Sequence, residues 1–143
     1  MPMTKNAIDE RRQYVRLNSA FPVEFQILDA NGAEVLSSWM EGFTSNISRG
    51  GMRLIIKGVN AETGALLTKK DIQLSLSIRI PMTAKPTEAT ARVIWLNKVE
   101  GVEPVQYHMG IKYLMIERVG FKRIMRYAHW RSFVGRLSKL FRK

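Results

Sequence analysis

Hydrophobic and polar residues alternate one by one along much of the middle of the chain. The clearest case is the segment 71–81, in which five aliphatic residues at even-numbered positions are separated by polar side chains. A period of two predicts a β-strand with one buried face and one face in water. Similar strand-like runs occur at 21–28, 39–46, 51–56, 90–96 and 106–116, separated by turn-rich pieces such as 57–63 and 98–104. With no helical pattern between these runs, the sequence predicts an all-β fold, either an antiparallel barrel or a sandwich.

The pattern changes after Glu117. Apolar residues then recur every three or four positions, which indicates a helix with one apolar side. They are Ile124, Tyr127, Trp130, Val134, Leu137 and Phe141. Gly135 weakens the interior of such a helix, so the segment forms either one continuous helix or two helices. We therefore divide the chain into an arm that we expect to be flexible (1–20), a β domain (21–116) and a basic amphipathic C-terminal helix (117–143).

Positive charge is concentrated in the C-terminal segment. The 143 residues, about the length of one domain, include 23 Lys and Arg against 12 Asp and Glu, a net charge of +11. Residues 117–143 contribute +8 of this charge, since they hold nine Lys and Arg and one acidic residue, Glu117. Such a field indicates an anionic partner, which could be nucleic acid, a nucleotide, phospholipid head groups or an acidic protein.

The composition argues against several classes of chemistry. The chain has no cysteine, so it has no disulfide, thiol nucleophile or thiolate metal site. The chain has only two histidines, His108 and His129, which argues against an imidazole metal site and a catalytic triad. It also has no Gly-rich phosphate loop with a lysine. We expect no cofactor, no metal and no enzymatic activity. Because no secretory signal and no membrane-spanning run is found, we expect a cytoplasmic protein.

Three arginines stand close together before the first predicted strand. Arg11, Arg12 and Arg16 lie within six residues, and the last two have the spacing Arg-x-x-x-Arg. A guanidinium is permanently charged, binds phosphate oxygens or the O6/N7 edge of guanine through paired hydrogen bonds, and stacks on base planes. The segment is thus either a solvated basic face or a site for an anionic purine ligand.

A second polar motif lies between the second and third predicted strands. Asn46, Ser48 and Gly51 form the pattern Asn-x-Ser-x-x-Gly, which is also typical of an ordinary turn. The amide suits a base edge, and the serine adds a hydroxyl. Gly50 and Gly51 permit a positive φ and a close approach of a ligand to the backbone. If the arginine segment folds across this turn, the two motifs form one pocket that suits a guanine nucleotide.

Together and in this order, the two motifs resemble those of the PilZ domain, the bacterial receptor module for cyclic di-GMP. The resemblance covers about residues 10–128. The segment Ala91-Arg-Val-Ile-Trp95 is similar to the Val-x-Trp strand of that family, and Tyr107-His-Met-Gly-Ile-Lys-Tyr113 is similar to its closing strand. The resemblance implies a six-stranded antiparallel β-barrel with a C-terminal α-helix, which binds cyclic di-GMP on its outer surface.

The resemblance also implies roles for the motif residues. Arg12 and Arg16 would hold the phosphates and the Hoogsteen edges of the guanines. Asn46 and Ser48 would contact a guanine, and Gly51 would set the turn. The module would act as a switch, because an arginine segment that orders on the ligand changes the surface offered to an effector protein.

Arg11 has two interpretations. It is either a solvated arginine or a further stacking or phosphate contact, and in the second case it favours two intercalated ligand molecules over one. Neither the motif nor the charge decides between these stoichiometries.

The C-terminal segment also keeps several interpretations. Its first part, to about Tyr127, is expected to cap one end of the barrel, with Val119, Phe121, Ile124 and Met125 in the core. The rest could dock on this protein or a second copy, or bind a partner groove, an anionic membrane or nucleic acid, with nucleic acid the less favoured. The alternative function is therefore a basic membrane- or nucleic-acid-binding adaptor whose barrel is only a scaffold.

Overall fold

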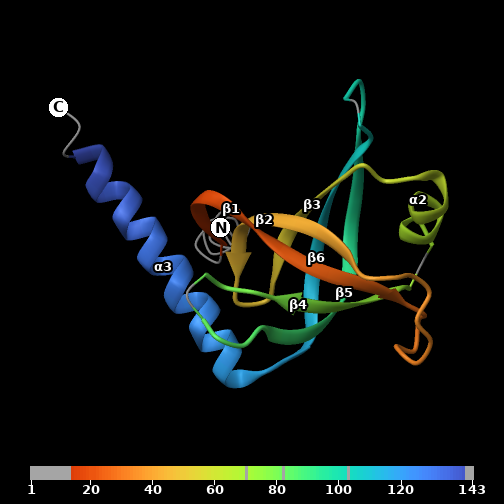
Figure 1. The fold of residues 1–143 in the computed structure, drawn as a ribbon, viewed down its shortest axis with the longest axis horizontal. Helices are drawn as coiled ribbons and strands as arrows, with labels where there is room; N and C mark the ends of the chain where they lie inside the picture. Colours follow the sequence, from red (N-terminus) through yellow and green to blue (C-terminus); the bar gives the residue numbers. More distant parts are fainter. Residues whose placement is uncertain (1–13, 70, 82, 103, 141–143) are drawn as a thin grey trace, which may run out of the picture.

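Six antiparallel strands close into a barrel in a computed structural model that describes residues 14–69, 71–81, 83–102 and 104–140. The order around the barrel is β1-β2-β3-β6-β5-β4, with β4 paired back to β1 (Figure 1). The strands are β1 (Tyr14–Leu28), β2 (Met40–Ser48), β3 (Gly51–Lys57), β4 (Gln73–Ile78), β5 (Thr87–Val99) and β6 (Gln106–Ile116). The helices are α2 (Ala61–Leu67) and α3 (Arg118–Leu140). The predicted six-stranded antiparallel barrel with a C-terminal helix is confirmed.

The alternating pattern of the sequence accounts for the core of the barrel. In β4 the aliphatic side chains of Leu74, Leu76 and Ile78 are buried, while the polar residues between them are half-buried. In β1 the residues Val23 and Phe25 turn inward in the same way. Full burial of each such side chain stabilises the fold by about 1.5–3 kcal/mol relative to its exposure.

Strand β1 begins at Tyr14 and not at position 21, where the sequence pattern places its start. Its first residues, Tyr14 to Arg16, pair with the end of β2, and the register then shifts before Phe21. Residues 14–20, expected as part of an arm, therefore belong to the sheet. Residues 1–13, with Arg11 and Arg12, lie outside the described part of the chain.

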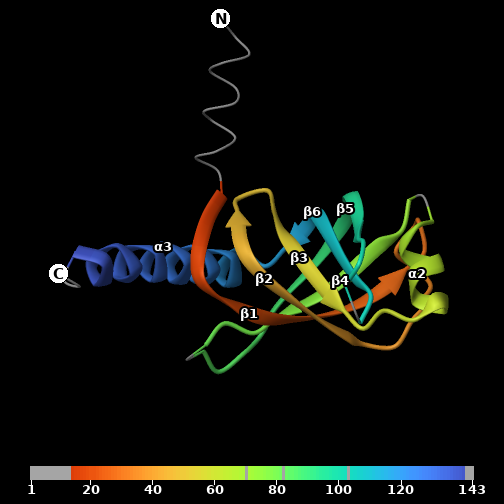
Figure 2. The ribbon, with the colours of Figure 1, turned by 90° about the horizontal axis from the view of Figure 1, so that it is seen from above.

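A short helix, α2, replaces part of a connection that we expected to be a turn. Asn60 caps its first turn, because the side-chain oxygen of Asn60 accepts a hydrogen bond of 2.8 Å from the backbone N–H of Thr63. Leu67 at its other end joins the barrel core. The helix lies at the end of the barrel opposite α3 (Figures 1 and 2).

Helix α3 is continuous through Gly135 and packs its first half on the other end of the barrel. Ile124 and Ala128 are fully buried in the core, so this part caps the barrel as expected. Phe121 and Met125 are only partly buried. Val119 was expected in the core but is 62% exposed, because a step of five residues turns it about 140° away from Ile124.

Candidate ligand-binding site

The turn between β2 and β3 is held by one serine side chain. The hydroxyl of Ser48 accepts a hydrogen bond of 3.1 Å from the backbone N–H of Gly51 and donates one of 3.2 Å to the carbonyl of Gly51. Ser48 is only 3% exposed. Its hydroxyl is thus already engaged within the turn, and the shape of the turn depends on it.

Gly51 is required by close packing and not by an unusual backbone angle. Among the described residues, the glycines with positive φ are Gly32, Gly58 and Gly101, so neither Gly50 nor Gly51 adopts the positive φ that glycine permits. A Cβ atom at position 51 would instead overlap the backbone carbonyl of Ile111 in β6. Gly51 therefore lets β3 approach β6, whereas Gly50 has open space around it.

The strand pairing sets the two sequence motifs beside each other. Arg16 in β1 lies opposite Asn46 in β2, and Tyr14 lies opposite Ser48. Asn46 in turn lies opposite Arg53 in β3. Residues directly opposite on neighbouring strands are about 5 Å apart and share a face of the sheet. The exposed side chain of Arg53 identifies this face as the outer surface of the barrel.

The same row of paired residues continues across two more strands. Arg53 lies opposite Gly110 in β6, and Gly110 lies opposite Trp95 in β5. The guanidinium carbon of Arg53 is 5.7 Å from the ring centroid of Trp95, which is cation–π distance. Because Gly110 has no side chain, the indole and the guanidinium meet above it. We call these five residues the barrel row: Arg16, Asn46, Arg53, Gly110 and Trp95.

Four of the six predicted site residues fall in the described part of the chain, and they come together. Arg16 and Asn46 belong to the barrel row, while Ser48 and Gly51 form the adjacent turn. Arg11 and Arg12 lie outside the described residues. The sequence analysis missed Arg53 and Trp95 as members of the site. A signal for Arg53 was present, since this charged residue lies between the buried Met52 and Leu54.

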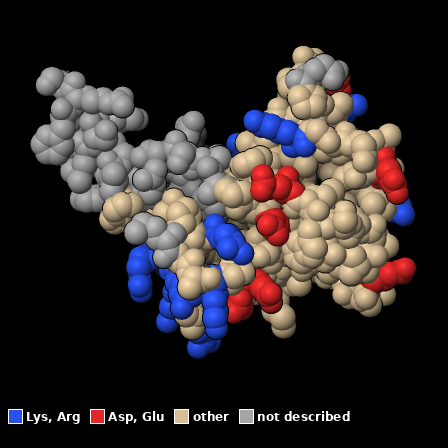
Figure 3. Space-filling view, viewed as in Figure 1, with Lys and Arg blue, Asp and Glu red and all other residues tan. Residues whose placement is uncertain are grey.

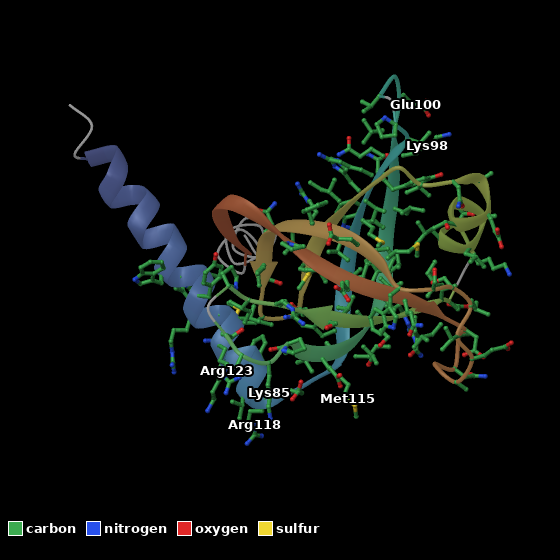
Figure 4. All side chains as sticks on the ribbon, viewed as in Figure 1. Lys85, Lys98, Glu100, Met115, Arg118 and Arg123 are labelled. Carbon is green, nitrogen blue, oxygen red and sulfur yellow. The ribbon has the colours of Figure 1, made fainter. Side chains whose placement is uncertain are left out.

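A basic surface begins next to this turn. Lys and Arg side chains gather over the start of α3 (Figure 3). Arg118 and Arg123 project there from the helix, with Lys85 of the β4–β5 connection beside them (Figure 4). Arg49, from the β2–β3 turn, and Arg118 also line a hollow of about 580 Å³ between the turn and the helix. Its other lining residues are Phe121, Lys122, Met125, Arg126 and His129.

Tyr113 marks the contact between the barrel and α3. Its ring meets the ring of Phe121 edge to face, with centroids 6.4 Å apart. Its hydroxyl is buried without a hydrogen-bond partner in the described part of the protein, and burial raises the pKa of the phenol. Within those same residues, no group of His, Asp or Glu side chains could hold a metal ion, and no helix is long and apolar enough to cross a membrane.

The described chain is thus a closed antiparallel barrel with a polar row on its outer face and a helix over one end. The family model described as PilZ domain matches residues 10–130, so the chain belongs to the PilZ domain family. PilZ domains are ligand-binding receptor domains. A search of curated proteins gave no match.

Two solved structures share the fold. The PilZ domain of YcgR from Escherichia coli, solved with c-di-GMP, has a TM-score of 0.56 and is 14% identical, over 92% of this chain and 98% of that one. The inhibitor of motility MotI/DgrA from Bacillus subtilis has a TM-score of 0.55 and is 17% identical, over 86% of this chain. The chain spans 51% of the length of the MotI/DgrA structure.

Proposed function

We propose that this PilZ domain is a receptor for cyclic di-GMP, which binds on the outer face of the barrel. The observation that carries the proposal is the register of β1 and β2, because it sets Arg16 directly beside Asn46. Arg16 of the first motif and Asn46 of the second, thirty residues apart in the sequence, are thereby neighbours. The family and the structure of the YcgR domain, which was solved with c-di-GMP, support the choice of ligand.

The motif residues suit the chemistry of this dinucleotide, which carries two phosphodiester charges and two guanines. Arg12 and Arg16 would bind phosphate oxygens and the O6/N7 edges of guanine. The amide of Asn46 would pair with a guanine edge. Since the hydroxyl of Ser48 is engaged with Gly51, we assign to this pair the task of shaping the turn against which the base rests.

The barrel row adds two groups to this site. Trp95 is 41% exposed, and we propose that the exposed part of its indole stacks on a base, an interaction worth about 1–3 kcal/mol. Arg53 supplies a further guanidinium between Asn46 and Trp95. The ligand would therefore extend from the β2–β3 turn toward β5.

Calorimetric titration with cyclic di-GMP tests the proposal. We expect saturable binding at micromolar concentration or below, weakened by salt because the contacts are charged. Arg12→Ala and Arg16→Ala should each cost about 1–3 kcal/mol of binding free energy. Lys98→Ala is the control, because Lys98 is an exposed cation on the β5–β6 hairpin, far from the turn (Figure 4). Equal binding by wild type and the double variant Arg12→Ala/Arg16→Ala would refute the assignment.

The same titration decides the role of Arg11. If Arg11 contacts the ligand and favours an intercalated pair, wild type binds two molecules per chain and Arg11→Ala binds one. If wild type and Arg11→Ala both bind one ligand molecule per chain, Arg11 is a solvated side chain and does not favour an intercalated pair.

The output of binding is proposed to be a contact with an effector protein in the bacterial cytoplasm. The ligand would hold the arginine segment against the barrel and so change the surface around the β2–β3 turn. Hydrogen exchange along residues 1–20, measured with and without cyclic di-GMP, tests this step. Protection should rise in the segment around Arg12 and Arg16, and unchanged exchange at saturating ligand would contradict the switch.

A further inference from the structure

The apolar positions in the two halves of α3 lie on opposite sides, so the single apolar side expected from the sequence does not run along the whole helix. In the first half, Ile124 and Ala128 face the barrel and are fully buried. In the second half the apolar positions are 130, 133, 134, 137 and 140. At about 100° per residue, this second group is centred roughly half a turn around the helix axis from the first. A helix that followed the barrel along its whole length would keep one apolar side.

By this helical geometry, the apolar positions of the second half fall on the side of the helix axis opposite to Ile124 and Ala128. Trp130, at the start of this apolar group, is 55% exposed. The same side of the first half carries Val119, which is 62% exposed, together with the exposed cations Lys122 and Arg126. The C-terminal half of α3 runs away from the barrel in both views of the ribbon (Figures 1 and 2).

The charge around this apolar side has a single sign. Residues 118–143 include nine Lys and Arg and no Asp or Glu. Lys85 adds a further cation beside Arg118 and Arg123 (Figure 4). An apolar stripe of Trp, Phe, Val and Leu that is bordered by cations is typical of helices that lie in the interface of an anionic membrane.

We propose that α3 binds an anionic phospholipid surface. Its second half would be embedded at the level of the head groups, and the cations of its first half would contact the head groups from the aqueous side. This inference is independent of cyclic di-GMP binding. Charge decides against a second copy of the chain, since two such helices would bring cations together without any acidic partner. The apolar side decides against nucleic acid, whose phosphates need only the cations.

Sedimentation with lipid vesicles tests the proposal. One set contains phosphatidylglycerol and phosphatidylcholine in equal parts, and the other contains phosphatidylcholine alone. Wild type should sediment with the first set and remain in the supernatant with the second, and added salt should reduce binding. Leu137→Gln should weaken binding about tenfold or more. Ser138→Gln is the matched control, because position 138 is turned about 100° from Leu137 and lies outside the apolar group, and it should bind as wild type.

Several results would overturn the proposal. They are equal binding of wild type to both sets of vesicles, no binding to either, and equal binding by Leu137→Gln and Ser138→Gln. Duplex DNA binding without lipid binding would assign the cations to nucleic acid. A dimer in lipid-free solution that Leu137→Gln dissociates would assign the apolar side to self-association. In a Trp39→Phe/Trp95→Phe variant with wild-type circular dichroism, the emission of Trp130 should shift to the blue on anionic vesicles alone.

Discussion

The indole of Trp95 lies over Gly110 of the neighbouring strand, in the space that a Cβ atom at position 110 would need. Arg53, on the other side of Gly110, reaches the same ring. A residue without a side chain therefore allows a cation and an aromatic ring from β3 and β5 to meet across β6. The contact between Arg53 and Trp95 on the outer face of the proposed site therefore depends on the missing side chain at position 110.

We predict that Gly110→Ala displaces Trp95 and lowers the free energy of unfolding by about 1–3 kcal/mol, the usual cost of an added methyl group in a filled space. Denaturant unfolding measures the change. The matched comparison is the same substitution in a Trp95→Ala background, where the methyl group has room and the cost should fall. An equal cost in both backgrounds would show that the indole is not the obstacle.

The two glycines of the β2–β3 turn should respond differently to alanine. Gly51→Ala drives a methyl group into the backbone of β6, which cannot move aside as a flexible side chain can, and we expect a loss of at least about 2 kcal/mol in stability. Gly50→Ala meets nothing within 4 Å and should change stability by less than about 0.5 kcal/mol. Similar melting temperatures for the two variants would contradict the packing argument.

The buried hydroxyl of Tyr113 should be dispensable for stability. Since it lacks a hydrogen-bond partner among the described residues, Tyr113→Phe removes a buried polar group and keeps the ring contact with Phe121. We expect the free energy of unfolding to stay constant or rise by up to about 1 kcal/mol. Chemical denaturation at neutral pH measures this free energy. A decrease of more than about 1 kcal/mol in the variant would show that the hydroxyl makes a stabilising hydrogen bond.

Asp29 should make the hairpin between β1 and β2 sensitive to acid. Its carboxylate accepts a hydrogen bond of 2.8 Å from the backbone N–H of Ala33, and hydrogen bonds from Ala33 and Glu34 lower the pKa of Asp29. A lowered pKa means that the carboxylate stabilises the fold above its unfolded pKa and loses this contribution as the pH falls through the folded value.

We therefore predict that wild type loses more stability than Asp29→Asn between about pH 6 and about pH 2. Urea midpoints for both proteins across this range measure the difference. Parallel curves would mean that the carboxylate contributes nothing to the turn.

Local pattern predicted the barrel but not all of its elements. Strand β4 could be predicted because every second residue is aliphatic, which only a half-buried strand requires. The start of β1 could not, because residues 14–16 join the sheet through pairing with β2 across a register shift. The helix α2 was hidden by its short length and by Gly64, and only Asn60, a good N-cap residue, marked its start.

The proposed site could also be predicted only in part. The motif residues could be named from the sequence, because arginine, asparagine and serine at these spacings match a known family. Their arrangement could not, because which residue lies opposite Asn46 depends on long-range register. Arg53 and Trp95 are far apart in the sequence and meet only because β6 lies between their strands.

A nuclear magnetic resonance titration with cyclic di-GMP tests the central claim most directly, since the chain has three tryptophans with separate indole signals. We predict that the Trp95 indole and the amides of Asn46, Arg53 and Gly110 shift to saturation, while the indole of the exposed Trp39 does not. Absence of shifts at saturating ligand, or shifts confined to residues away from the barrel row and the β2–β3 turn, would contradict the account.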